Sequence, residues 1–214
     1  MKAIIFDMDG VLFDTERLCM DSWIAVAREN GIPDMEAFFP RCIGRNQTDT
    51  AALFREFYGE SYDYEQFRQQ ASEKFHEDIV QKGMPVKKGV REILEFLRQR
   101  KYRIGLASSS SRPSVEEHLE RTGLREYFQS LTTGDMVEHS KPQPDIYRMA
   151  CESMGVDPQE AMAIEDSPNG IRAAYSAGMI PIMVPDLIEP DQEMQEKSML
   201  ICRDLLEVMA FLDK

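Results

Sequence analysis

The first ten residues of the chain place two carboxylates directly after a short apolar segment. Residues 3–6 are all apolar and are typical of a short buried strand. Asp7 and Asp9 follow them, and Gly10 lets the backbone turn immediately afterwards. Two acids this close repel each other unless a cation or a shared proton relieves the charge. Because open α/β sheets hold ligands at the carboxyl ends of their strands, the segment predicts a site for a hard metal ion and a phosphate.

From about residue 84 onward, strand-like and helix-like segments alternate. The predicted strands cover residues 103–107, 128–133, 161–164, 180–184 and 200–202. The predicted helices cover residues 90–100, 113–121, 145–154, 171–177 and 205–212. Strands that alternate with helices form βαβ units, so this pattern predicts an α/β fold with a doubly wound parallel sheet.

The segment between residues 15 and 83 carries no strand signal. Its predicted helices cover residues 15–30, 48–58 and 64–81, and glycines mark their ends. This helical insert interrupts the alternation just after the first strand. We therefore expect a core domain made of residues 1–14 and 84–214, and a helical cap domain made of residues 15–83.

Four predicted strand ends carry side chains suited to phosphoryl transfer. These are Asp7 and Asp9 after the first strand, Ser108 after the second, Lys141 in the loop after the third, and Glu165 with Asp166 after the fourth. The carboxyl ends of parallel strands lie on one edge of a sheet, so we expect these groups to converge.

The acidic residues at these strand ends can divide the chemistry between them. Asp7 is ionised at neutral pH and needs no base to act as a nucleophile. The side chains of Asp7 and Asp166 and the carbonyl of Asp9 offer hard oxygen ligands to Mg²⁺, and Glu165 is a further candidate ligand. Asp9 can protonate the leaving oxygen and then deprotonate water.

Ser108 and Lys141 also have ordinary structural interpretations. A serine at this position often caps a helix, and a lysine is most often a solvated surface residue. Pro142 and Pro144 weaken the second interpretation, because they restrict a backbone that a surface lysine would not need restricted. As functional groups, Ser108 would donate a hydroxyl to the phosphoryl oxygens and Lys141 would place a positive charge on them.

The motifs around these residues resemble those of the haloacid dehalogenase superfamily. They are F-D-M-D-G-V-L-F-D-T-E at 6–16, A-S-S-S at 107–110, S-K-P-Q-P-D-I-Y at 140–147 and I-E-D-S-P-N-G-I at 164–171. The resemblance extends from residue 1 to about 184, and the helical insert is similar to the small cap of the β-phosphoglucomutase-like branch. It implies a Rossmann-like core, a Mg²⁺ cofactor and an aspartyl-phosphate on Asp7. Asp9 as the second acid implies a phosphatase or phosphomutase rather than a dehalogenase.

In that branch, the cap loop at 41–48 would face the active site and help to choose the substrate. The expected substrate-binding residues are Gly44 and Arg45 in this loop, with Ser109, Ser110 and Arg112 after the second strand. The sugar-phosphate mutases carry an arginine three residues after the loop glycine and Lys-Asn after the second motif. Here Gln47 and the pair Ser111-Arg112 occupy those places. These differences favour a phosphatase acting on a small phosphorylated metabolite, such as a sugar phosphate, over a phosphomutase. A phospho-receiver module is a more remote alternative.

Composition narrows the range of partners and compartments. The formal net charge is −13, which argues against nucleic acid as a partner because phosphate backbones need clustered Lys and Arg. The chain has no apolar run as long as a membrane span and no signal-peptide pattern at its start. Its four cysteines are scattered, as is typical of free thiols in a reducing compartment. We therefore expect a cytoplasmic protein, and a monomer because nothing in the sequence demands an oligomer.

Overall fold

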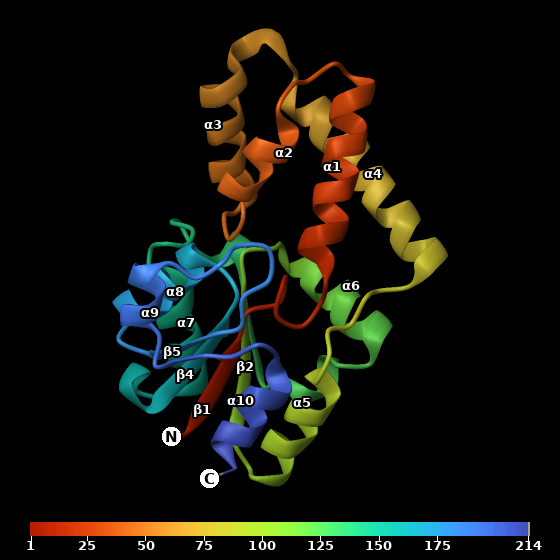
Figure 1. Cartoon of the computed structure of the whole chain (residues 1–214). Coiled ribbons are helices and arrows are strands. Elements are labelled where there is room, and N and C mark those ends of the chain that lie inside the picture. The colour runs from red at the N-terminus through yellow and green to blue at the C-terminus, as the bar shows by residue number, and fades with distance from the viewer. Residues whose placement is uncertain (214) are drawn as a thin grey trace.

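The computed structural model describes residues 1–213, and its centre is one all-parallel six-stranded sheet (Figure 1). The strands are β1 (Ala3–Phe6), β2 (Arg103–Ser108), β3 (Ser130–Thr133), β4 (Ala161–Glu165), β5 (Ile180–Met183) and β6 (Leu200–Ile201). Their order across the sheet is β3-β2-β1-β4-β5-β6. The first strand therefore lies inside the sheet between β2 and β4, and the predicted α/β fold class is confirmed.

Helices cover both faces of this sheet. They are α5 (Val90–Gln99), α6 (Arg112–Thr122), α7 (Asp145–Met154), α8 (Pro168–Ser176), α9 (Gln192–Lys197) and α10 (Leu205–Leu212). Side chains alternate between the faces of β1, so Ile4 and Phe6 join one apolar cluster with α5, α6 and α10. Ala3 and Ile5 join a second cluster with α7 and α8. The core around the sheet thus consists of two apolar layers, one on each of its sides.

Four further helices lie beyond the carboxyl edge of the sheet, at the top of Figure 1. They are α1 (Thr15–Glu29), α2 (Met35–Phe38), α3 (Gln47–Tyr58) and α4 (Tyr64–Lys82). Their apolar faces form a third cluster in which aromatic rings meet, for example Trp23 and Phe67 with centroids 5.1 Å apart. We call these four helices and their connecting loops the cap. The exact domain boundaries at residues 14 and 83 stay predictions.

Several element boundaries differ from those expected from the sequence. The helices α2 and α9 were not predicted, because four residues are too few to show a helical period and α9 has only one buried residue, Met194. Strand β3 begins two residues later than expected, after a 3₁₀ turn at Arg125–Tyr127. Helix α8 begins three residues earlier, because Pro168 is compatible with the first turn and the Ser167 hydroxyl accepts a hydrogen bond from the Gly170 amide.

Short 3₁₀ turns connect some of these elements, at Phe39–Arg41, Gly59–Ser61, Arg125–Tyr127, Gly134–Met136 and Pro158–Glu160. Within residues 1–213, none of the helices combines the length and the hydrophobicity that crossing a bilayer requires.

Candidate active site

The loops that follow β1, β2 and β4 lie side by side, because these strands are neighbours in the sheet. Six of the predicted site residues lie at the carboxyl ends of these strands, in the loops that follow them, or in the loop before α7. Five are almost completely buried, namely Asp7, Ser108, Lys141, Glu165 and Asp166, and Asp9 is half-buried. The structure therefore brings together polar side chains that are up to 159 positions apart in the sequence (Asp7 to Asp166). Burial of so many polar groups requires that they satisfy one another.

Lys141 connects the two sides of this cluster. Its side chain is 1% exposed, and the ammonium group donates to Oδ1 of Asp7, to Oε1 of Glu165 at 2.6 Å and to the Ala107 carbonyl at 3.1 Å. Burial by itself lowers the pKa of Lys141, but the charges of Asp7 and Glu165 outweigh burial and raise it above its ordinary value. Lys141 is therefore a fixed positive charge beside Asp7 and not a mobile surface lysine.

Glu165 is completely enclosed by donors. In addition to the Lys141 bond, its Oε1 accepts from the Tyr147 hydroxyl at 2.8 Å. Its Oε2 accepts from the amides of Asp166 at 3.0 Å and Ser167 at 3.2 Å, and from the Ser167 hydroxyl at 3.2 Å. Both carboxylate oxygens are therefore already occupied by hydrogen bonds within the protein.

Tyr147 and Gly170 are parts of this arrangement that reasoning from the sequence missed. A Cβ at Gly170 would lie 1.9 Å from Oε1 of Glu165, so only glycine leaves room for the carboxylate. Both residues fall inside the third and fourth motifs, and that placement was the only available signal. Their contacts with Glu165 became visible only in three dimensions.

Three carboxylates form the most acidic part of the site. Oxygens of Asp7, Glu165 and Asp166 lie within 4.8 Å of one another. Burial raises the pKa of Asp7 to about 8; the Lys141 charge opposes this shift and the Glu165 charge adds to it. Burial, and after it the charges of Glu165 and Asp7, also raises the pKa of Asp166 well above its usual range.

This donor set fits a hard divalent cation. Buried carboxylates with raised pKa values are ionised at neutral pH only when positive charge is added. Carboxylate and carbonyl oxygens are the ligands that Mg²⁺ prefers. Gly10 permits the close packing, because a Cβ at this residue would lie 2.3 Å from Oδ2 of Asp166. The chemistry of the residues is thus compatible with the Mg²⁺ site expected from the sequence.

Asp9 is oriented by hydroxyl groups from two directions. Its Oδ1 accepts from Thr15 at 2.5 Å, at the start of α1, and its Oδ2 accepts from Ser110 at 2.9 Å and from Ser108 at 3.5 Å. These bonds tie the Asp9 carboxylate to the beginning of the cap and to the loop after β2. Asp9 also lines a large cavity between the core and the cap, where a proton can be exchanged with a bound molecule.

That cavity has a volume of about 930 Å³, and the cap loop forms part of its wall. Core side chains hold this loop in place. The Ser109 hydroxyl donates to the Gly44 carbonyl at 3.0 Å, and the Asn169 amide donates to the Ile43 carbonyl at 3.1 Å. The Ser140 hydroxyl also donates to Asp49, near the start of α3. The cap is therefore docked on the same loops that carry the predicted catalytic residues.

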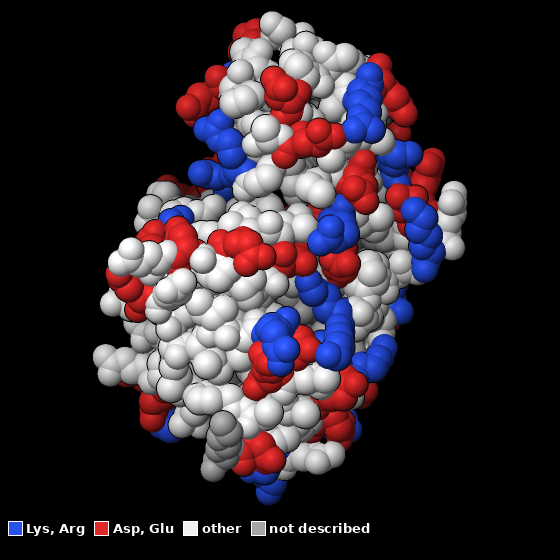
Figure 2. Space-filling model, in the orientation of Figure 1, with Lys and Arg blue, Asp and Glu red and all other residues white. Residues whose placement is uncertain are grey.

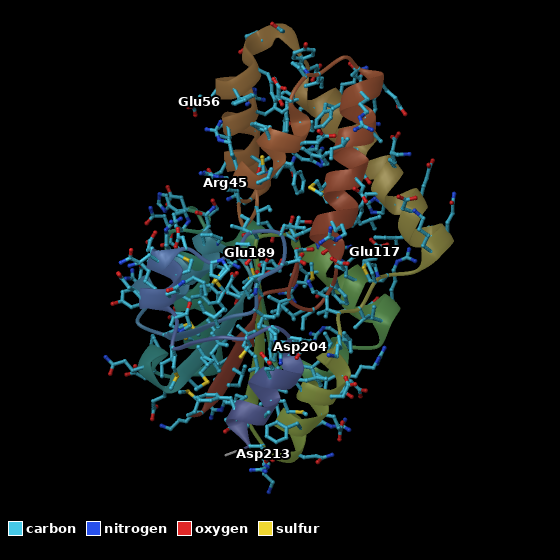
Figure 3. All side chains as sticks on the ribbon, viewed as in Figure 1. Arg45, Glu56, Glu117, Glu189, Asp204 and Asp213 are labelled. Carbon is cyan, nitrogen blue, oxygen red and sulfur yellow. The ribbon has the colours of Figure 1, made fainter. Side chains whose placement is uncertain are left out.

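The two candidate anion-binding arginines have different surroundings. Arg45 is half-buried and lines the cavity, and Figure 3 places it at the lower end of the cap, next to the core. Arg112 is bound by Glu116 at 3.0 Å and is not among the residues from 1 to 213 that line the cavity. Arg112 is part of α6 and its surface ion pair, so the expectation that it binds substrate finds no support in the geometry.

Comparison with known proteins agrees with this geometry. The family model for haloacid dehalogenase-like hydrolases matches residues 4–184, which is most of the chain. The chain belongs to this family. The haloacid dehalogenase-like hydrolases thus supply the fold and the enzyme class that the four motifs indicated.

Several relatives of this hydrolase are phosphatases by name. A phosphorylated carbohydrates phosphatase of Thermotoga maritima is 34% identical over 179 residues, which are 84% of this chain and 82% of the relative. Hexitol phosphatase B of Escherichia coli strain K12 is 30% identical over 194 residues, covering 86% and 83% of the two chains. The crystal structure of β-phosphoglucomutase from Clostridium difficile superimposes with a TM-score of 0.80 at 25% identity, covering 97% of this chain and 93% of that one. The resemblance to the β-phosphoglucomutase-like branch is thus confirmed.

Proposed function

We propose that this hydrolase is a Mg²⁺-dependent phosphatase that releases phosphate from a small phosphorylated carbohydrate through an aspartyl-phosphate on Asp7. The observation that carries the proposal is the buried contact of Lys141 with both Asp7 and Glu165. It keeps a carboxylate and a fixed cation together at the carboxyl edge of the sheet. Two relatives are named as phosphatases of phosphorylated carbohydrates and of hexitols, and these names support this class of substrate.

Asp7 is the proposed nucleophile. Lys141 donates to its Oδ1, which leaves Oδ2 to attack phosphorus in line with the leaving oxygen. The attack forms an O–P bond to Asp7 and breaks the bond between phosphorus and the leaving oxygen. Water then attacks the phosphorus, returns the Asp7 carboxylate and releases inorganic phosphate.

Asp9 is the proposed general acid and base. Its protonated carboxyl group donates a proton to the leaving oxygen in the first step, and the carboxylate that this leaves accepts a proton from the attacking water in the second. The bonds from Thr15 and Ser110 keep the carboxylate at the cavity wall and limit its rotation. This placement lets one group serve both steps, because leaving group and water enter from the cavity side.

The residues that would hold Mg²⁺ are Asp7 and Asp166 through their side chains and Asp9 through its carbonyl. The ion would neutralise charge on the phosphoryl oxygens and on the acids around them. Glu165 stands apart from this set, because five donors already occupy its two oxygens. We assign it the role of positioning Lys141 rather than that of a metal ligand.

A phosphomutase is the second candidate, and Arg45 is the observation that favours it. Arg45 lines the cavity, and within residues 1–213 it forms no ion pair, so it is able to bind a second phosphate. Gln47 stands where the mutases that this chain resembles carry an arginine, which favours water as the acceptor. A receiver module is less compatible, because the docked cap encloses Asp7.

The two enzyme functions can be separated with glucose 1-phosphate. We expect release of inorganic phosphate to exceed formation of glucose 6-phosphate when both are followed in one reaction with Mg²⁺. Faster formation of the isomer would instead identify a mutase. Turnover of p-nitrophenyl phosphate in the same buffer tests the phosphatase chemistry without a sugar, and its absence with every divalent metal would favour the receiver module.

The remaining expectations about partners are also proposals. All four cysteines are free thiols, which is compatible with a reducing compartment such as the cytoplasm. The visible face of the molecule mixes acidic and basic side chains without a broad basic area (Figure 2), which supports a small metabolite rather than nucleic acid as the ligand. We propose that the hydrolase works as a monomer, because the site is built from one chain.

A further inference from the structure

We propose that one face of α6, formed by Ser111, Ser114 and His118, binds hydroxyl groups of the leaving group and so selects polyhydroxylated phosphate esters. We call these three residues the α6 stripe. The inference rests on the proposed phosphatase function and adds to it the part of the site that recognises the alcohol rather than the phosphate.

His118 gives the first indication that this face takes a ligand. It is 6% exposed and lines the cavity. Its ring packs edge-to-face with Phe13 and tilted against Phe75, at centroid distances of 6.0 and 6.2 Å. Its buried Nδ1 has no hydrogen-bond partner among residues 1–213, and no bond to Nε2 is formed there either. Buried polar atoms in proteins nearly always have a partner. Nδ1 is enclosed, whereas Nε2 is not, so Nε2 is the ring nitrogen that a hydroxyl group of a bound molecule can reach from the cavity.

The two serines extend this polar face toward the start of the helix. Ser111 is the N-cap residue of α6, and Ser114 and His118 follow it at spacings of three and four positions, so the three lie along one side of the helix and all line the cavity. The hydroxyls of Ser111 and Ser114 are 3.1 Å apart and bond to each other. Two hydroxyls have two protons and only one is used in that bond, which leaves a donor free for a ligand.

The Ser111 end of the α6 stripe lies next to the place proposed for the leaving oxygen. Ser110, the residue before it, donates to Asp9 at 2.9 Å, and Asp9 is the proposed proton donor to the leaving oxygen. From Ser111 to His118 the helix rises by roughly 10 Å at about 1.5 Å per residue. With hydrogen bonds of about 2.8 Å at its hydroxyls, an extended six-carbon chain such as that of a hexitol can reach across this length.

The chemistry of His118 favours a hydroxyl over a second phosphate. Burial lowers the pKa of His118, so the ring is neutral at pH 7 and offers one donor and one acceptor. A hydroxyl group can either donate or accept, so it can bond to Nε2 in either tautomer of the ring. A phosphate would need a cation at this position, and within residues 1–213 the residues of the stripe supply none.

Two substitutions with a matched control test the inference. His118→Phe keeps an aromatic ring between Phe13 and Phe75 and removes both nitrogens, and Ser114→Ala removes one hydroxyl. Glu120→Gln changes a charge on the exposed, opposite face of the same helix and serves as the control. The substrates are glucose 6-phosphate and sorbitol 6-phosphate, compared with p-nitrophenyl phosphate and hexyl phosphate, which lack carbon-bound hydroxyls.

For the wild-type enzyme, we expect a higher kcat/KM with the two polyhydroxylated esters than with hexyl phosphate. His118→Phe should lower kcat/KM for the polyhydroxylated esters about tenfold, mainly through KM, and leave the other two esters within about twofold. Ser114→Ala should act in the same direction with a smaller effect, and Glu120→Gln should change neither class.

An equal loss on all four esters, or no loss on the polyhydroxylated ones, would overturn the role of the stripe. So would a wild-type enzyme that prefers hexyl phosphate. Failure of the wild-type enzyme to hydrolyse any of the esters with Mg²⁺ would instead reject the proposed phosphatase function, so the two failures can be told apart.

Discussion

Gly170 leaves the space that the Glu165 carboxylate occupies, since a Cβ on Gly170 would lie 1.9 Å from Oε1 of Glu165. This relationship connects helix α8 to the charge balance of the site. Glu165 forms an ion pair with Lys141, and Lys141 forms a second ion pair with Asp7. A methyl group added to Gly170 is therefore expected to displace Glu165 and, through Lys141, to disturb the proposed nucleophile Asp7.

Gly170→Ala should lower both stability and activity. In an open helix, glycine to alanine stabilises by about 1 kcal/mol, but here the added methyl overlaps a buried carboxylate. We expect the free energy of unfolding to fall by about 2 kcal/mol and kcat to fall at least tenfold. Urea denaturation and hydrolysis of p-nitrophenyl phosphate measure the two effects. Glu165→Ala removes the carboxylate with which the new methyl group overlaps. Gly170→Ala should therefore lower the free energy of unfolding less in the Glu165→Ala background than in the wild-type background. Equal effects in both backgrounds would contradict the steric explanation.

Asp7→Asn should abolish turnover and leave the fold intact. Asparagine keeps the shape of the side chain and removes its nucleophilic charge, so kcat should fall by more than about 10⁴. Circular dichroism and thermal unfolding verify that the protein is folded. Asp145→Asn alters a more exposed acid that pairs with His139 and serves as the control, with activity expected to remain. Turnover by Asp7→Asn in a preparation free of contaminating phosphatase would refute the assignment.

Asp9→Asn should slow the reaction by about 10² or more, because the leaving oxygen and the attacking water lose their proton donor and acceptor. The decrease should be larger for an alkyl phosphate than for p-nitrophenyl phosphate, whose leaving group needs little protonation. Comparing kcat for the two esters measures this difference. A variant that loses the same factor on both esters would show that Asp9 acts in another way.

The stability of the metal-free protein should depend on pH in a direction set by Asp7 and Asp166. Their pKa values are raised in the folded state, that of Asp7 to about 8, so the folded protein binds protons that the unfolded chain has released. This contribution to stability is complete below the unfolded pKa near 4 and is lost as pH rises toward 8. The slope can reach about 1.4 kcal/mol per pH unit for each such carboxyl.

Urea denaturation in EDTA at pH 5 and pH 8 measures this effect. We expect a lower free energy of unfolding at pH 8, and we expect added Mg²⁺ to stabilise the protein more at pH 8 than at pH 5, because the ion competes with protons for the same oxygens. Asp7→Asn/Asp166→Asn should flatten the pH dependence and remove the stabilisation by Mg²⁺. Equal stabilisation by Mg²⁺ at both pH values would count against a metal site at these acids.

Gly44→Ala should impair substrate selection more than stability. Gly44 has φ of +76°, and a Cβ there would lie 2.9 Å from the Ser167 hydroxyl, so alanine forces the cap loop away from the core. We expect a several-fold loss in kcat/KM and a change in the midpoint of thermal unfolding of only about 2 °C, because the strain is confined to a loop. Gly59→Ala changes a positive-φ glycine in the cap that has no neighbour within 4 Å, and it should lower stability without changing kcat/KM. An equal loss of kcat/KM in both variants would show that the cause is general destabilisation of the cap and not displacement of the cap loop at Gly44.

The order of chemical types along the chain was enough to predict the fold class. Apolar segments alternate with amphipathic ones, and this alternation predicts parallel strands connected by helices. The helices predicted at residues 145–154 and 205–212 have the same bounds in the structure, Asp145–Met154 and Leu205–Leu212. The four motifs also named the residues that lie at the carboxyl edge of the sheet. The catalytic, metal-binding and substrate-binding roles given to these residues stay predictions.

Only the tertiary structure decided which groups touch. The structure shows that Glu165 contacts Lys141, that Arg112 pairs with Glu116, and that Nδ1 of His118 has no hydrogen-bond partner among residues 1–213. The Glu165 and His118 observations depend on distances between segments far apart in the sequence. Periodicity reports which face of an element is buried, because that property is local. It carries no information about the donors and volumes that neighbouring elements bring, and those decide the charge state and the shape of the site.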